Sequence, residues 1–277
     1  MTNKWLKVAL MVTAIATGTS IKIDAETVLY VPQDDRPVSL QYTVDTAREA
    51  GMTVLTPPQH LISGKTYQGQ ADQIMAWVEQ NAGRADVMVL STDTLIYGGL
   101  VDSRKHNIPL STLQNRLKRI EGLKARNKNV RIYGFGTVMR SPRASGGGTE
   151  PAYYAEYGPT IFQIAALQDK LDSGSLTQEE TQKLMSLQAS VPVEYLQDWF
   201  DRRQKNMKIN KELIDETRSG VFDYFALGHD DTSQLSQSAL EGRYLNKYSK
   251  DISVEKYGSF PGADQLGLLL ICLLYTS

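Results

Sequence analysis

Short apolar runs alternate along this chain with longer segments in which apolar residues recur every three or four positions. The runs occupy residues 28–31, 53–56, 87–90, 130–138 and 221–227. Runs of this length are typical of strands buried on both faces, and the longer spacing is typical of amphipathic helices. Strands that alternate with helices build a parallel sheet, because each parallel crossover needs a long connection. The sequence therefore predicts an α/β fold with a mainly parallel sheet, either barrel-like or doubly wound.

The helical segments are not evenly distributed between the runs. Single helical stripes separate the first four runs, whereas several consecutive helical stretches occupy about 160–220. The second of these stretches begins with the capping box Thr177-x-x-Glu180, in which both side chains satisfy backbone N–H groups. We therefore expect a helical insertion within an α/β domain that covers residues 26–270.

The first residues have the pattern of an export signal. Lys4 and Lys7 precede an apolar stretch at 8–17 that is too short to span a bilayer, and Ala25 offers a small residue for cleavage. We interpret residues 1–25 as a signal peptide and expect an exported protein, periplasmic or extracellular. An uncleaved membrane anchor is the alternative, because the cleavage region contains an acidic residue.

Charge and cysteine content narrow the classes of partner. The 30 basic and 31 acidic residues give a net charge of −1, which provides no electrostatic footprint for nucleic acid or for an anionic membrane surface. We therefore expect a carbohydrate or another small polar ligand, no nucleic acid, and no membrane contact beyond the export signal. The single Cys272 cannot form an internal disulfide, so stability has to come from the core.

Two acidic doublets directly follow apolar runs. Asp34-Asp35 comes after the first run and Asp230-Asp231 after the last. Unpaired buried carboxylates cost several kcal/mol each, so acidic residues delivered by apolar strands indicate a cleft. Parallel strands end at one edge of a sheet, where ligands bind in both open sheets and barrels. We take all four aspartates as candidate acid or base catalysts.

Neighbouring strand side chains point to opposite faces, so only one aspartate of each doublet should enter a given site. The other would brace its neighbour or cap a helix. The alternative roles are structural: Asp35 caps the helix that follows it while Arg36 makes an ordinary ion pair, and Asp231 caps a helix that starts near Ser233.

Further candidates would bind the substrate. Arg36 can orient a carboxylate or clamp an anionic group, and a Tyr-rich loop at 140–158 can provide stacking faces for a sugar ring. The alternatives are structural: Asp93, which follows the third run, would stabilise a turn, and the tyrosines would form a cluster packed on the helical insertion. The candidate substrate-binding residues are Arg36, Asp93, Arg140, Glu150, Tyr157 and His229.

The motifs of several cofactor-dependent or nucleophilic enzymes are absent from the sequence. Gly146-Gly147-Gly148 lacks the Lys-Ser/Thr that follows in a phosphate-binding loop, and neither H-E-x-x-H nor G-x-S-x-G occurs. We therefore expect no cofactor and no zinc. A divalent cation such as Ca²⁺ or Mg²⁺ on the oxygen-rich doublets stays an alternative, although no EF-hand spacing is present.

Several segments together resemble one exported bacterial family, domain-of-unknown-function family 4127 (DUF4127). The resemblance implies no established activity, and it implies that family members are longer than this chain. After Leu270 the chain departs from the pattern, and we expect residues 271–277 to be a truncated or non-native end. The matching segments run in order along the chain: Tyr30 to Val38, Asp93 with Tyr97 to Arg104, the Tyr-rich segment to Gly158, Gly228 to Thr232, and Pro261 to Asp264.

These observations lead to one functional hypothesis with two alternatives. The chain is predicted to be an exported hydrolase, glycoside hydrolase-like, that uses aspartates at strand ends as acid and base on a carbohydrate. A non-catalytic extracytoplasmic protein that binds sugars or cations is the first alternative. A Mg²⁺- or Ca²⁺-dependent hydrolase is the second.

Overall fold

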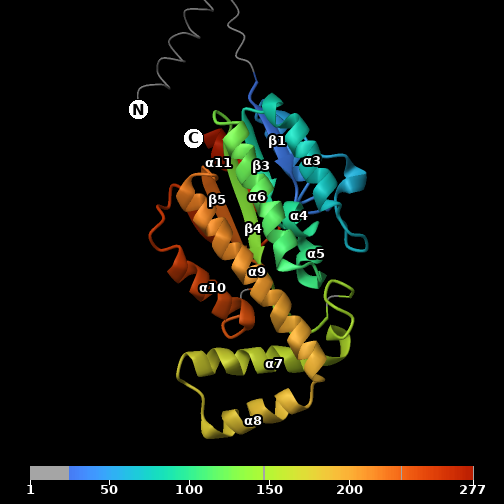
Figure 1. The fold of residues 1–277 in the computed structure, drawn as a ribbon, viewed down its shortest axis with the longest axis vertical. Helices are drawn as coiled ribbons and strands as arrows, with labels where there is room; N and C mark the ends of the chain where they lie inside the picture. Colours follow the sequence, from blue (N-terminus) through green and yellow to red (C-terminus); the bar gives the residue numbers. More distant parts are fainter. Residues whose placement is uncertain (1–24, 146, 232, 277) are drawn as a thin grey trace, which may run out of the picture.

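The computed structural model describes residues 25–145, 147–231 and 233–276, and its centre is a six-stranded sheet (Figure 1). Neighbouring strands pair in parallel throughout, in the order β2-β1-β3-β4-β5-β6. The predicted α/β fold with a parallel sheet is confirmed, and the described strands form an open, doubly wound sheet rather than a barrel. The strands are β1 (Thr27–Val31), β2 (Thr53–Leu55), β3 (Val87–Ser91), β4 (Arg131–Val138), β5 (Tyr224–His229) and β6 (Tyr257–Pro261).

The sheet is covered by helices on both faces because its strands are apolar on both faces. Leu29 and Val31 of β1 pack with α3 (Ala71–Asn81), α6 (Leu110–Arg126) and the second half of α9 (Val193–Ser219). On the opposite face, Val28 and Tyr30 pack with α2 (Gln41–Glu49) and α11 (Leu266–Thr276). Figure 1 shows α3, α6 and α9 side by side in front of the strands.

The helical insertion forms a separate apolar cluster beyond one end of the sheet. It consists of α7 (Tyr154–Asp172), α8 (Gln178–Ala189) and the first half of α9, packed around Trp199. The capping box of Thr177 and Glu180 is present at the start of α8. Helix α9 continues without a break from this cluster to the sheet (Figure 1), so it ties the insertion to the main core.

Some elements differ from the prediction. The last predicted strand begins three residues later than the apolar run, because its pairing with β4 starts at Tyr224, opposite Tyr133. Helix α7 begins inside the segment expected to be a loop, where the buried Tyr154 contacts Trp199. Several elements were not predicted from the sequence: β6, α11 and four short or connecting helices, η1 (Gln59–Leu61), η2 (Ala82–Arg84), α4 (Thr92–Tyr97) and α5 (Leu100–Lys105).

Helix α10 (Gln237–Tyr248) completes the layer that contains α9. Its N-cap is Ser236, whose hydroxyl accepts a hydrogen bond from the Ala239 N–H at 3.1 Å. The predicted helix start near Ser233 is therefore wrong by several residues.

Among the described residues, no helix has both the length and the apolar character needed to cross a membrane. The signal peptide expected over residues 1–25 lies outside the described residues, apart from Ala25.

Candidate functional site

A cavity of about 320 Å³ lies at the carboxyl edge of the sheet, at the end where α5 is found (Figure 1). Loops that follow β1, β4, β5 and β6 contribute to it, which is the expected result when all strands run in parallel. We call it the strand-edge cavity. Its lining residues are Asp34, Arg36, Lys65, Leu100, Val101, Arg104, Arg140, Thr149, Asp230 and Asp264.

In each acidic doublet, one aspartate lines the strand-edge cavity and its neighbour lines another hollow. Asp34 lines the strand-edge cavity, whereas Asp35 lines a hollow of about 550 Å³ between α2 and the segment after β2. Asp230 also lines the strand-edge cavity, whereas Asp231 lines a third hollow of about 340 Å³. Both doublets lie just after their strands, β1 and β5, where the chain bends, and their two carboxylates point to different hollows.

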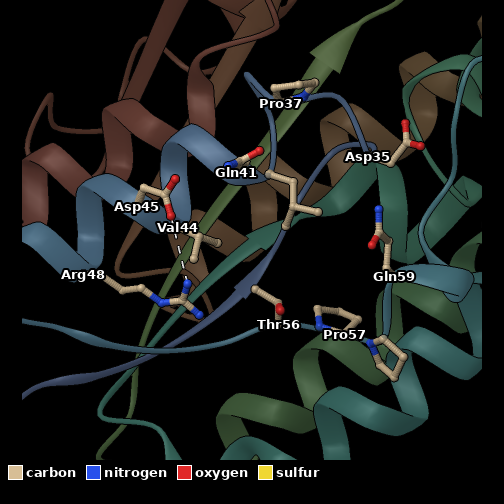
Figure 2. A pocket seen from close by; sticks show the side chains of 11 residues that line it. Asp35, Pro37, Gln41, Val44, Asp45, Arg48, Thr56, Pro57 and Gln59 are labelled. Atoms are coloured by element: carbon tan, nitrogen blue, oxygen red, sulfur yellow. Dashed lines mark ion pairs between the residues drawn. The ribbon is translucent and has the colours of Figure 1, made fainter.

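Figure 2 shows the hollow that contains Asp35. This aspartate lies at its rim, and its carboxylate accepts a hydrogen bond from the Tyr67 hydroxyl. Asp45 and Arg48 of α2 line one side, 4.0 Å apart. Asp35 does not cap the following helix, because the N-cap of α2 is Leu40 and no side chain bonds to its first turn.

Arg36 links two loops of the strand-edge cavity. Its Nε donates to Asp34 Oδ2 at 2.8 Å, and its Nη2 donates to Asp264 Oδ1 at 2.8 Å. Asp264 follows β6, so this pair joins the first strand loop to the last one. Asp264 was not predicted as a site residue, because β6 was not predicted.

Arg104 and Asp230 form a buried ion pair on the wall of the cavity. The Nη2 of Arg104 lies 2.5 Å from Asp230 Oδ2, and the side chains are 5% and 13% exposed. Burial raises the pKa of Asp230, while the charges of Arg104 and Arg140 act in the opposite direction. Arg104 was also missed as a site residue, because α5 is too short to produce a helical apolar pattern.

Arg140 lies after β4 and is fixed from two sides. Its Nε donates to Glu150 Oε1 at 2.8 Å and its Nη2 to Thr149 Oγ1 at 2.7 Å. The Nη1 of Arg203 on α9 donates to the Arg140 carbonyl at 2.9 Å. Arg203 also binds Glu241 of α10 through two hydrogen bonds of 2.7 Å. The long predicted loop is therefore held at its start by the core.

Asp93 lies close to the cavity without lining it. Its carboxylate is buried and accepts hydrogen bonds from Gln33 Nε2 at 3.0 Å and Thr137 Oγ1 at 2.8 Å. Burial raises the pKa of Asp93 to about 6, and the nearby charge of Asp230 adds to this shift. Asp93 sits in the first turn of α4, after the N-cap Ser91, rather than in the turn that the structural alternative assumed.

Two predicted substrate-binding residues lie elsewhere. Tyr157 belongs to the insertion, where its ring lies 5.4 Å from that of Tyr195, as in the tyrosine cluster considered as an alternative. His229 lines the third hollow, with its Nε2 2.7 Å from Ser259 Oγ. Burial lowers the pKa of His229. Neither residue lines the strand-edge cavity.

Asp231 has a local structural role in addition to lining the third hollow. Its carboxylate accepts hydrogen bonds from the Ser233 N–H at 2.9 Å and the Ser141 N–H at 3.3 Å. These bonds connect the loops after β4 and β5. The proposed helix-capping role of Asp231 is wrong, since Ser236 caps α10.

In the described part of the chain, no group of three or more His, Cys, Asp or Glu residues is arranged to hold a metal ion.

A family model described as "Protein of unknown function (DUF4127)" matches residues 28–276. The chain belongs to the DUF4127 family. The DUF4127 match continues past Leu270, where we had expected the chain to depart from the family pattern. No curated protein matches the chain.

Proposed function

We propose that this DUF4127 chain is an exported hydrolase, periplasmic or extracellular, that cleaves a carbohydrate at the strand-edge cavity. Asp230 would act as the acid and Asp34 as the base. The observation that carries this proposal is the selection of one aspartate from each doublet for a single cavity. Two carboxylates in different environments are the usual requirement for cleavage of a glycosidic bond.

The environments of the two aspartates support this assignment of roles. Asp230 is largely buried, and burial raises its pKa, which favours a carboxyl group that carries a proton to the leaving oxygen. Asp34 is held by Arg36, and this ion pair fixes the orientation of the carboxylate for removal of a proton from water. Asp231 has no part in this mechanism because it faces another hollow.

The test compares neighbouring aspartates in the full chain. Asp34→Asn and Asp230→Asn should each lower the release of reducing ends from a glycan panel by at least about 100-fold, since acid–base groups contribute 10²- to 10⁴-fold. Asp35→Asn and Asp231→Asn are matched controls and should retain activity. Circular dichroism and thermal unfolding would confirm that all four variants fold. Undiminished turnover in folded Asp230→Asn would contradict the proposal.

A non-catalytic sugar-binding protein is the second candidate, and the ion pairs favour it. Both proposed catalytic carboxylates are held in ion pairs by arginines, and a carboxylate oxygen engaged in such a pair is less available for proton transfer to or from a substrate. Saturable sugar binding without release of reducing ends, at any pH between about 4 and 8, would support this candidate instead.

A further inference from the structure

The strand-edge cavity is rich in cationic side chains. Four of its ten lining residues are basic, and three are acidic. A neutral sugar needs hydrogen-bond donors and acceptors for its hydroxyls, and does not need three arginines from three separate segments of the chain. The basic residues are Arg36, Lys65, Arg104 and Arg140.

The three arginines have donors that no described residue of the chain occupies. Arg36, Arg104 and Arg140 bind their carboxylate partners through Nε or Nη2, and among the described residues no Nη1 of the three takes part in a hydrogen bond. The Nε of Arg104 is buried and has no hydrogen-bond partner among the described residues, so the donors of Arg104 that a ligand could reach are those of its Nη groups.

Lys65 adds a charge that is not neutralised. It is exposed at the cavity and forms no ion pair with any residue that the structure describes. By contrast, the guanidinium groups are paired with Asp34, Asp230, Asp264 or Glu150. The three arginines and Lys65 together balance these four carboxylates, so Lys65 is the basic lining residue that stays available to an anionic group.

The cavity also offers acceptors. Asp230 Oδ1 and Asp264 Oδ2 accept no hydrogen bond within the described part of the chain, while the second oxygen of each is bound by an arginine. Free carboxylate oxygens suit sugar hydroxyls, and guanidinium forks suit the oxygens of an acidic group. The volume of about 320 Å³ is at the small end of ligand sites, near 300 Å³, and so favours one sugar ring.

We propose that the strand-edge cavity binds an acidic sugar, with the acid group on the guanidinium donors and Lys65, and with the hydroxyls on Asp230 and Asp264. The acid group is a carboxylate, sulfate or phosphate, which share the same oxyanion chemistry. This inference rests on the proposed function for the sugar part of the ligand, and it specifies the substrate class of that site.

Binding rather than turnover tests this inference, so that its outcome is separate from that of the proposed hydrolysis. Titration calorimetry on the full chain would compare glucuronate, glucose 6-sulfate, glucose 6-phosphate and glucose. We expect at least one acidic sugar to bind about tenfold more tightly than glucose, because charge-assisted hydrogen bonds are roughly twice as strong as neutral ones. The three acids distinguish the possible acid groups.

Two variants test which basic residues cause the preference for acidic sugars over glucose. Lys65→Gln removes an exposed charge without breaking an ion pair. This variant should lower the preference for acidic sugars about threefold, and the remaining preference should depend less on salt concentration. Arg104→Gln should lower it further. Arg48→Gln is the matched control, because Arg48 lines the other hollow in Figure 2 and should leave binding unchanged.

Specific results would overturn the inference. Glucose that binds as tightly as all three acids would do so, and so would an unchanged preference in both Lys65→Gln and folded Arg104→Gln. Equal binding of acetate, inorganic sulfate or inorganic phosphate would contradict the role of the hydroxyls. An acidic sugar that binds with this preference, together with a glycan panel from which no reducing ends are released, would support the inference and contradict hydrolysis.

Discussion

Asp93 and His106 are buried titratable residues whose pKa values move in opposite directions. Burial raises the pKa of Asp93 from 3.8 to about 6 and lowers that of His106 from 6.5 to about 4. His106 is neutral in the fold: its Nδ1 accepts from the Ile108 N–H at 3.3 Å, so Nε2 carries the proton toward Asn206 Oδ1 at 2.8 Å. Both groups contribute to the pH dependence of stability over nearly the same range.

The signs of these contributions are opposite. Between about pH 4 and 6 the folded chain keeps a proton on Asp93 that the unfolded chain releases, so this residue lowers the free energy of unfolding as pH rises. His106 raises it over about pH 4 to 6.5, because the unfolded chain binds the extra proton. Each shift corresponds to roughly 3 kcal/mol.

We therefore expect single substitutions to reveal slopes that cancel in the unmodified chain. Asp93→Asn should make the free energy of unfolding rise with pH from 4 to 6.5, and His106→Gln should make it fall with pH from 4 to 6. Urea titrations at half-unit pH steps would measure both. Parallel profiles for the two variants and the unmodified chain would contradict these assignments.

At the scale of the elements, helices α9 and α10 are joined by an ion pair between Arg203 and Glu241. Its side chains are only 1% and 7% exposed. Arg203→Ala would leave the Glu241 carboxylate buried and unpaired, so we expect a loss of about 3–5 kcal/mol in the free energy of unfolding. Lys208→Ala on the same helix breaks an exposed pair with Glu212 and should cost less than about 1 kcal/mol. Equal losses in urea titrations would be inconsistent with this explanation.

The elements that the sequence predicted are those with a strong apolar pattern. β3 is buried at every position and α6 buries Leu113, Leu117, Ile120 and Leu123 on one stripe, so both patterns are easy to recognise. β6 pairs only with β5, lies at the sheet edge and ends in Pro261, and therefore lacks an apolar run. Helices α4 and α5 have six residues each, too few to establish a period.

At the scale of the whole molecule, α11 closes one face of the sheet. Leu270 is fully buried against the strands, whereas Leu273 on the same helix is 36% exposed. Leu270→Ala should lower the free energy of unfolding by about 2–5 kcal/mol, because it leaves a cavity in the core. Leu273→Ala should change it by no more than about 0.5 kcal/mol. A negligible effect of Leu270→Ala in thermal and urea unfolding would show that α11 is not part of the core.

The sequence by itself determined the α/β class, the parallel strands, the helical insertion and the place of the acidic residues at strand ends. These properties depend on local periodicity and on the common direction of parallel strands. Only the tertiary structure decided that Asp34 and Asp230 share a cavity while Asp35 and Asp231 leave it, and that Arg104 and Asp264 complete the lining. These positions depend on strand order and on the packing of short elements, which join residues far apart in the chain and have no local pattern.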